Sequence, residues 1–483
     1  MTRLKTELAG LDATAQAELV RDGETSAGEL VEAAIAGIEE INPEINAVIH
    51  PLFEEGREAA RGDLPEGPFT GVPFLLKDLG AAFAGQPYHL GMQALKDAGF
   101  QAPFDTFLAE RFRAAGFVTI GKTNTPELGI LPTTEPRAYG ATRNPWDTGR
   151  SPAGSSGGSA AAVASGMVPI AHANDGGGSI RLPAGACGLV GLKPTRQRIS
   201  EGPLIGDNMS GLTNELVVSR SVRDTAAVLD AVHGAAPGDP YVAPPPERPY
   251  LDEVGSDPGR LRIGLMTETF LDVEPDPVVV EASKDAAKLL ESLGHDVTDD
   301  HPTGFEPFDI ADTFLTRWMA GQAATLAQLG SLLGRELGAG DVEPLTHALA
   351  EEGRRRSSGD YLAAVGQHHT IARMFAAWYE GGHDLLLTPT MGEPPTPLGA
   401  FDDSGGDPID AIRRAFLTAT YTAPFNATGQ PAISLPLHWT DDGLPIGIQL
   451  VAPFGREDVL ISVAAQLEEA RPWADRRPPV FAS

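Results

Sequence analysis

Apolar and polar residues follow a helical period in some segments of the chain and a strand-like pattern in others. Asp12 predicts the N-cap of a short helix, and Ser26 with Glu29 forms a capping box that predicts the start of a second helix. Apolar residues of this second helix recur at helical spacing up to the pair Asn42 and Pro43. We expect the helix to end at this pair, because proline disrupts helix interiors.

The later segments alternate between predicted strands and predicted helices. Short apolar runs predict strands at residues 45–49, 117–120, 261–266, 385–387, 432–437 and 446–451. Helices are predicted at residues 159–164, 277–294 and 457–470, the second with Asp276 as its N-cap and Pro277 at its first position. Residues 305–378 are mostly helical and predict a cover inserted between two groups of strands.

This order of elements predicts an α/β fold with a central mixed β-sheet sandwiched by helices and a mostly helical inserted cover. We expect a single domain over residues 1–483. Its expected parts are a helical N-terminal part at residues 1–65, a core at 66–232, the cover at 305–380 and a return to the core sheet at 381–483. Periodicity leaves the strand order open.

Composition narrows the classes of function. The chain of 483 residues carries a formal charge of -30, which opposes binding to nucleic acid or to an anionic membrane surface. No apolar stretch approaches the roughly 20 residues of a membrane-spanning helix, and no secretory leader is recognised. The single cysteine, Cys187, excludes an internal disulfide and a cysteine-based metal cage, and its apolar neighbours predict a packed thiol. We therefore expect a cytoplasmic protein.

Two clusters rich in serine and glycine lie close together in the sequence, at residues 152–159 and 174–181. Glycine runs let the backbone turn its N–H groups inward, and such a nest can bind the oxyanion of an acyl-transfer intermediate. Ser179 directly follows the glycines at 176–178. Flexible surface loops are the alternative, but apolar segments flank both clusters and favour tight turns against a core.

A nucleophilic serine needs a base, which histidine paired with a carboxylate often supplies. Ser156 stands at the centre of a G-x-S-x-G pattern at residues 154–158, but a preceding strand of the kind that such a motif needs is not predicted. His172 is predicted to be a packed or surface histidine rather than a base. Neither residue completes a histidine-based site.

Lysine is another kind of base, and Lys77 ends the apolar run at residues 71–76. Burial disfavours the ammonium form. Neutrality at pH 7 costs about 4.6 kcal/mol from a reference pKa of roughly 10.4, and burial lowers a lysine pKa by up to about 3 to 5. A neutral Lys77 can therefore act as a base, with an ion pair between Lys77 and a carboxylate such as Asp78 as the alternative.

Residues 116–123 match the phosphate-loop pattern G-x-x-x-x-G-K-[ST] letter for letter. In a phosphate-binding loop, the strand precedes the first glycine and a helix follows the lysine. Here the predicted strand lies inside the motif, and Pro126 follows soon after Lys122. We therefore do not expect nucleotide binding.

The lysine and the two serine clusters together resemble the amidase signature family. The resemblance covers nearly the whole chain, with matching segments at residues 71–77, 121–124, 154–159, 175–181, 191–195, 425–426, 429–432 and 447–450. It implies a single amidase-signature domain that cleaves a C–N bond of a small-molecule amide through an acyl-enzyme, without a cofactor or a metal.

Carried over by position, the resemblance implies Ser179 as the nucleophile, Ser155 as a bridging serine entered through a cis peptide bond, and Lys77 as the base. The separation of 24 positions between Ser155 and Ser179 is typical of the family and favours Ser155 over Ser156. The implied oxyanion hole consists of four backbone N–H groups, those of Gly176, Gly177, Gly178 and Ser179.

The chain departs from the family pattern at Ala153, at Gly176, where threonine is common, and at Gln197, where glycine is common. We expect altered loop stiffness from these changes rather than lost chemistry. Arg181 is expected to support the loop, with binding of a substrate carboxylate as the alternative.

Within the family, residues 12–54, 133–136 and 144–146 look most similar to bacterial amidases near the nylon-oligomer (6-aminohexanoate cyclic dimer) hydrolases. The cover is less matched, so nylon oligomers, anilides, lactams and carbamates all stay open as substrates. The alternatives are a glutamine-hydrolysing subunit of an amidotransferase and a non-catalytic binding protein with the same fold. A homodimer is the candidate assembly.

Overall fold

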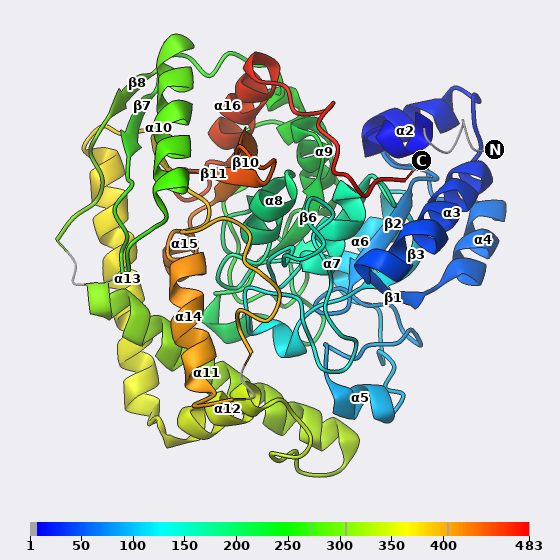
Figure 1. Cartoon of the computed structure of the whole chain (residues 1–483), viewed down its shortest axis with the longest axis horizontal. Coiled ribbons are helices and arrows are strands. Elements are labelled where there is room, and N and C mark those ends of the chain that lie inside the picture. Colours follow the sequence, from blue (N-terminus) through cyan, green and yellow to red (C-terminus); the bar gives the residue numbers. More distant parts are fainter. Residues whose placement is uncertain (1–6, 272, 305–306, 403–404, 483) are drawn as a thin grey trace.

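A mixed β-sheet runs through the molecule and carries the rest of the fold (Figure 1). The computed structural model describes residues 7–271, 273–304, 307–402 and 405–482. In these residues eleven strands form one sheet, which from edge to edge comprises β1 (Val48–Pro51), β3 (Val118–Thr123), β2 (Pro73–Lys77), β4 (Ile170–Asn174), β6 (Glu215–Ser219), β5 (Val190–Lys193), β10 (Ala432–Trp439), β11 (Pro445–Val451), β9 (Leu385–Pro389), β7 (Arg262–Leu265) and β8 (Asp296–Thr298).

The sheet joins early and late parts of the chain. Strands β3, β2 and β4 are parallel, as are β9, β7 and β8, whereas the central pairs from β4 to β9 are antiparallel. The late strand β10 pairs with the early strand β5. The prediction that late strands complete a mixed sheet begun by early ones is therefore confirmed.

Helices surround this sheet in the described residues (Figure 1). They are α2 (Ala13–Arg21), α3 (Ala27–Ile45), α4 (Phe53–Arg61), α5 (Gln93–Asp97), α6 (Phe107–Ala114), α7 (Gly157–Ala164), α8 (Arg181–Cys187), α9 (Val222–Val232), α10 (Pro277–Ser292), α11 (Pro307–Leu333), α12 (Pro344–Arg355), α13 (Ser358–Glu380), α14 (Ile409–Ala419), α15 (Ala423–Thr428) and α16 (Glu457–Ala470). The expected α/β architecture of sheet and enclosing helices is confirmed.

The first helices begin where the sequence predicts. The side chain of Asp12 accepts a hydrogen bond from the N–H of Ala15, and Ser26 and Glu29 form the complete capping box of α3. Each cap satisfies backbone N–H groups that have no partner within the helix. Local side-chain chemistry therefore sets these two starting points.

The predicted end of α3 at Asn42 and Pro43 is wrong, because the helix continues to Ile45. The Asn42 side-chain oxygen accepts hydrogen bonds from the N–H groups of Ala47 and Val48, just beyond the helix. This side chain stabilises one further turn, and the first strand consequently begins at Val48 instead of residue 45.

Helices α11, α12 and α13 form the predicted cover, at the left and bottom of Figure 1. Inward apolar side chains of α11 and α12 belong to a second hydrophobic cluster, separate from the core of the sheet, and those of α13 belong to a third. In the second cluster Leu326 and Leu329 of α11 join Leu90, Leu128 and Ile130 of the early loops. The cover therefore packs on loops that precede the serine clusters. The cover is expected to begin at residue 305, and residues 305–306 lie outside the described residues.

The phosphate-loop pattern at residues 116–123 forms no phosphate loop. Strand β3 occupies most of it, and the lysine of the motif, Lys122, is buried with its amine 2.7 Å from the carboxylate of Asp78. The Lys122 amine is therefore held in an ion pair, and the residues that match the motif form a buried strand rather than a phosphate-binding loop. Cys187 is buried and free, as predicted for a packed thiol.

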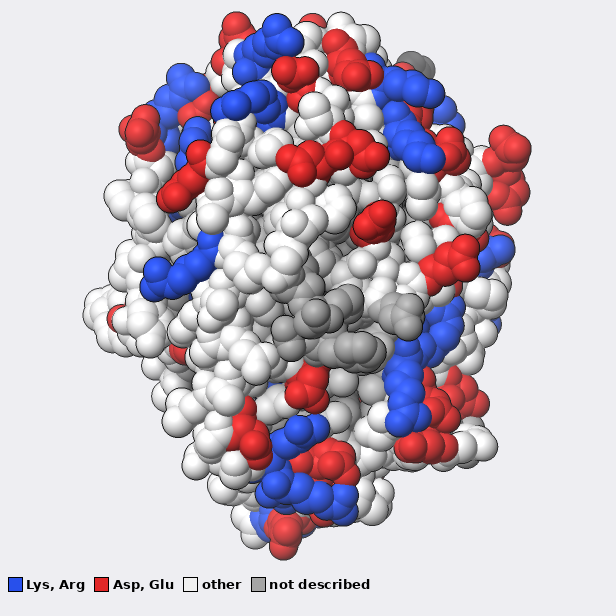
Figure 2. Space-filling model, turned by 90° about the vertical axis from the view of Figure 1, so that its left-hand side faces the viewer, with Lys and Arg blue, Asp and Glu red and all other residues white. Residues whose placement is uncertain are grey.

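The surface matches the acidic composition. On the face shown in Figure 2, Lys and Arg are interspersed with Asp and Glu instead of forming a continuous basic patch. Among the described helices, none is long and apolar enough to cross a membrane. The described residues also contain no group of three or more His, Cys, Asp or Glu side chains that could hold a metal ion.

Candidate active site

The residues singled out in the sequence meet at one edge of the sheet. Lys77 is the last residue of β2, and the cluster that contains Ser179 follows the neighbouring strand β4. Because β2 and β4 are parallel, their carboxyl ends lie at the same edge. Ser155 lies two residues before α7, which packs against both strands. Sheet topology thus brings together residues about 100 positions apart.

The amine of Lys77 is fully buried and has three close oxygen neighbours. Its Nζ lies 2.7 Å from Oγ of Ser155, 3.0 Å from Oγ of Ser156 and 2.6 Å from Oδ1 of Asn174. Burial lowers the pKa of Lys77 to about 7, although the negative charges of Glu215 and Asp175 oppose the shift. The predicted uncharged state of this lysine is therefore accessible near neutral pH.

The alternative ion pair between Lys77 and Asp78 is wrong. Consecutive side chains of an extended segment point to opposite sides, so Asp78 turns away from Lys77. Its carboxylate contacts Lys122, and His50 at 3.5 Å. Lys122, not Lys77, is the lysine whose charge Asp78 balances.

Ser155 and Ser179 border the same cavity but do not hydrogen-bond to each other in the described structure. The peptide bond between Gly154 and Ser155 is cis, as the family resemblance implies. Ser155 is 2% exposed and Ser179 is 8% exposed. Ser156 instead lies inside the fold, where its hydroxyl donates to the carbonyl oxygen of Asn174.

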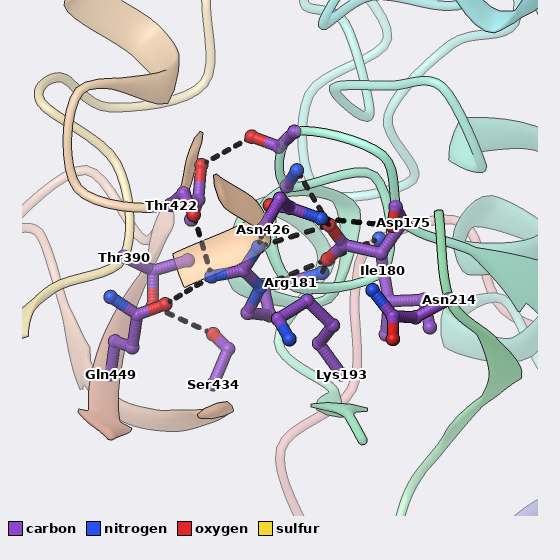
Figure 3. Close-up of polar contacts among 12 residues, drawn as sticks. Asp175, Ile180, Arg181, Lys193, Asn214, Thr390, Thr422, Asn426, Ser434 and Gln449 are labelled. Carbon is purple, nitrogen blue, oxygen red and sulfur yellow. Dashed lines mark hydrogen bonds and ion pairs between the residues drawn. The ribbon is translucent and has the colours of Figure 1, made fainter. Parts of the chain in front are cut away.

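An ion pair between Asp175 and Arg181 shapes the loop that carries Ser179 (Figure 3). The carboxylate of Asp175 accepts hydrogen bonds from the backbone N–H groups of Gly178, at 2.7 Å, and Ile180, at 3.2 Å. Burial disfavours its charge, but Arg181 lowers the pKa of Asp175 to about 2. The loop therefore wraps around a charged carboxylate.

Arg181 has no donor left for a substrate. Its guanidinium donates to both oxygens of Asp175, to the side-chain oxygens of Asn426 and Gln449, and to the carbonyl oxygen of Thr422 (Figure 3). The side chain is also completely buried. Loop support is thus confirmed, and the alternative of binding a substrate carboxylate is wrong.

Of the four backbone N–H groups predicted as oxyanion donors, one already has an acceptor in the structure. The N–H of Gly178 already donates to Asp175. Within the described residues, the N–H groups of Gly176, Gly177 and Ser179 have no acceptor. Three donors of the predicted set are therefore free to bind an oxyanion.

In this loop Gly178 has no room for a side chain, and a Cβ at Gly176 would be crowded. At Gly178 the backbone has φ +137, and a Cβ would lie 2.3 Å from the Thr422 hydroxyl. At Gly176 a Cβ would lie 3.1 Å from the ring of Trp318 in the cover. The glycine at 176, where the family commonly has threonine, thus makes room for this tryptophan.

Sequence reasoning missed Asn174 and Glu215. Residue Glu215 lies opposite Asn174 across the antiparallel strands β4 and β6, and its carboxylate contacts both Asn174, at 3.3 Å, and His172, at 2.7 Å. Burial raises the pKa of Glu215 to about 8, although Lys77 opposes the shift. Burial also holds the pKa of His172 well below its usual range, which agrees with the prediction of a packed histidine. The only local signal in the sequence was that His172 and Asn174 stand two positions apart, so that both side chains lie on the same face of the strand.

Two cavities meet at Ser179. The smaller has a volume of about 80 Å³ and lies between Ser179, Leu182 and apolar side chains of α11 and α14. The larger has a volume of about 280 Å³ and borders Ser155, Ser179 and the carboxyl groups of Glu201 and Glu215. A scissile bond at Ser179 would therefore have space on both sides.

Comparisons with known proteins agree with this geometry. A sequence profile of the amidase family matches residues 29–461. A 6-aminohexanoate-cyclic-dimer hydrolase of Paenarthrobacter ureafaciens is 46% identical over 475 residues, which cover 97% of this chain and 96% of that protein. A solved structure of 6-aminohexanoate cyclic dimer hydrolase is similar with a TM-score of 0.94 and 46% identity, covering 98% of this chain and 99% of that chain. The crystal structure of a bacterial aryl acylamidase has a TM-score of 0.86 and 27% identity, covering 96% and 97%.

Proposed function

The chain belongs to the amidase family and hydrolyses C–N bonds of small amides, and we propose that it does so through Ser179 as nucleophile, Ser155 as bridging serine and Lys77 as base. The observation that carries this proposal is the buried contact between Lys77 and Ser155, next to the cavity where Ser179 lies. A serine nucleophile needs a proton acceptor, and this pair supplies one.

The hydrogen bonds of Lys77 support its role as a base. A neutral amine keeps two N–H donors and one lone pair. The side-chain oxygen of Asn174 only accepts, and the Ser156 hydroxyl has given its own proton to a carbonyl, so both take N–H donors from Lys77. The lone pair then faces the hydroxyl of Ser155. The uncharged lysine is thereby oriented to accept the proton of Ser155.

The proposed reaction follows from this orientation. Ser179 Oγ attacks the amide carbonyl carbon while its proton passes to Ser155 and the proton of Ser155 passes to Lys77. As the C–N bond breaks, Ser155 donates its proton to the leaving nitrogen and takes a proton back from Lys77. A water molecule attacks the resulting acyl-enzyme by the same proton route, releasing the acid and restoring Ser179.

The proposed oxyanion hole consists of three backbone N–H groups, those of Gly176, Gly177 and Ser179. Loop residues held by Asp175 keep these donors in place before substrate arrives. Such preorganised donors stabilise the charge that develops on the carbonyl oxygen. Removal of one donor of this kind costs roughly 10²- to 10³-fold in rate in other acyl-transfer enzymes.

The proposed substrate is a small uncharged amide, with the 6-aminohexanoate cyclic dimer as the first candidate because a relative with 46% identity is named for it. Anilides, lactams and carbamates are the further candidates. Glutamine is disfavoured, because its carboxylate needs a cation, and the described lining of the two cavities includes Glu201 and Glu215 but neither Lys nor Arg.

Labelling and a substrate panel test the proposal. A fluorophosphonate should modify Ser179, as located by peptide mass spectrometry, and folded Ser179→Ala protein should neither label nor turn over any amide. Folded Lys77→Ala protein should be severely impaired. A label on Ser156, or near-normal rates without Lys77, would contradict the assignment.

The proposal also includes an oligomeric state and a cellular compartment for the protein. A cytoplasmic homodimer stays a prediction, and light scattering of the purified protein tests its oligomeric part. Activity of the purified chain alone also separates a free-standing amidase from an amidotransferase subunit, which would need its partners.

A further inference from the structure

One face of α11 lines both cavities. The lining residues lie at helical spacing, as expected for a single face, and include Ala311, Phe314, Trp318, Gln322, Thr325 and Gln328. The face is apolar from Ala311 to Leu315 and becomes polar at Gln322 and Thr325. Trp318 lies between the apolar part and the polar part of this face and borders both cavities.

Gln322 has no partner inside the larger cavity. Its side chain is 0% exposed, and within the described structure neither its Oε1 nor its Nε2 forms a hydrogen bond. The indole N–H of Trp318, one turn earlier, also lacks an acceptor. Buried amides are almost always hydrogen-bonded, so an unpaired one that faces a cavity indicates a group that binds there.

The position of Ser155 indicates which part of a substrate occupies each cavity. Ser155 borders the larger cavity and is absent from the lining of the smaller one. Under the proposed function, Ser155 returns the proton to the leaving nitrogen, so this nitrogen lies on its side. The amine part of the substrate then extends into the larger cavity, and the acyl part into the apolar smaller one.

We propose that Gln322 recognises a second amide group in the amine part of the substrate. This inference rests on the proposed roles of Ser179 and Ser155. A glutamine side chain offers one carbonyl acceptor and one N–H donor direction to a planar partner, which a substrate amide complements with its own N–H and C=O. The enzyme thereby selects a diamide whose second amide lies beyond the scissile nitrogen.

Three matched compounds test the proposal. All are amides of a linear alkyl amine with a linear acyl group of equal length. The first is a hexanoyl amide with a secondary amide within the amine chain, the second is a hexanoyl amide with two methylenes at that place, and the third has its second amide in the acyl chain instead. We expect kcat/KM to be about 10- to 100-fold higher for the first compound than for the second, because a site that hydrogen-bonds a substrate group rejects analogues that lack it. The third should gain no such advantage.

A substitution of similar size isolates the side chain. In Gln322→Met the ratio between the first and second compounds should fall to about threefold or less, because methionine fills the space without hydrogen bonds. Gln16→Met is the matched control, since Gln16 is a buried glutamine in α2 that also has an unpaired oxygen. It should keep the wild-type ratio. An undiminished ratio in folded Gln322→Met would overturn the proposal.

Binding to the Ser179→Ala protein separates this inference from the proposed function. Calorimetry should give a Kd about 10-fold or more lower for the first compound than for the second, with no turnover needed. Equal Kd values would overturn the role of Gln322 even if wild type hydrolyses both compounds. Unequal Kd values without any hydrolysis by wild type would support the recognition site and refute the catalytic assignment alone.

Discussion

The amine of Lys77 lies 2.6 Å from the side-chain oxygen of Asn174, a contact that orients the proposed base toward Ser155. The amide oxygen accepts a hydrogen bond from either form of the amine, but it carries no charge that would favour the ammonium form. An uncharged partner at this place is thus compatible with the lowered pKa of Lys77.

The first prediction replaces this neutral partner by a charged one. In wild type, kcat/KM should rise with pH and level off above a pH near 7, because Lys77 must lose its proton to act as a base. Asn174→Asp should raise the pKa of Lys77 by about 1 to 3, and the rise of kcat/KM should move to higher pH by the same amount. Asn174→Ala, which adds no charge, should not move it upward. pH–rate profiles of the three proteins check this, and an unmoved profile in Asn174→Asp would exclude Lys77 as the titrating group.

The second prediction concerns the charge of Glu215. Burial keeps Glu215 largely protonated at pH 7, and only its charged fraction raises the pKa of Lys77, so Glu215→Gln should lower that pKa slightly and move the rise of kcat/KM to lower pH. The control is Glu468→Gln, because Glu468 is another largely buried carboxyl, whose pKa burial raises to about 7, and it contacts Val222 rather than the site. The same pH–rate measurement applies. A shift of equal size in both variants would show that the effect is not specific to Glu215.

The third prediction separates two adjacent serines that both contact Lys77. Ser155→Ala should lower kcat by about 10²- to 10⁴-fold, the range expected when a proton-transferring group is lost. Ser156→Ala should lower it less than about 10-fold, because Ser156 lies inside the fold and only supports Lys77 and Asn174. Single-turnover acylation rates check the difference. Equal losses in two folded proteins would refute the bridging role of Ser155.

Local signals in the sequence predicted the elements better than their contacts. The caps at Asp12 and Ser26 were correct, because they depend on neighbouring residues alone. The end of α3 was wrong, because the side chain of Asn42 binds backbone beyond the helix, which helical period does not reveal.

The candidate site was predictable only as far as its motifs reach. The resemblance identifies Lys77, Ser155 and Ser179. Glu215 is 41 residues from Asn174 in the sequence and lies at the site because its strand, β6, pairs with β4. Gln322 comes from the cover, where no motif marks it. Its significance depends on a missing partner inside a cavity, which is a property of the folded chain.

The fourth prediction concerns the ion pair under the nucleophile loop. Arg181→Met should lower the free energy of unfolding by about 3 to 5 kcal/mol, because it leaves the carboxylate of Asp175 buried without its cation. Adding Asp175→Asn should recover part of this loss, since no uncompensated charge remains. Arg57→Met removes an exposed ion pair with Glu32 and should have a much smaller effect. Urea unfolding checks the series, and similar losses at Arg181 and Arg57 would contradict the buried-charge explanation.

The fifth prediction concerns Gln197, which occupies a place where the family commonly has glycine. Its backbone has φ 60, in the left-handed region that favours glycine, and its side chain donates to the carbonyl oxygen of Gly206. Gln197→Gly and Gln197→Ala both remove that hydrogen bond, so their difference isolates the backbone. The left-handed backbone destabilises the alanine variant, whereas the greater freedom of glycine in the unfolded chain destabilises the glycine variant by less. The glycine variant should therefore be more stable by about 0.5 to 1 kcal/mol. At Gln367, exposed in the middle of α13, the order should reverse, because alanine favours helix over glycine by about 1 kcal/mol. Urea unfolding of the four variants measures both differences, and an alanine preference at both positions would show that φ at Gln197 relaxes at little cost.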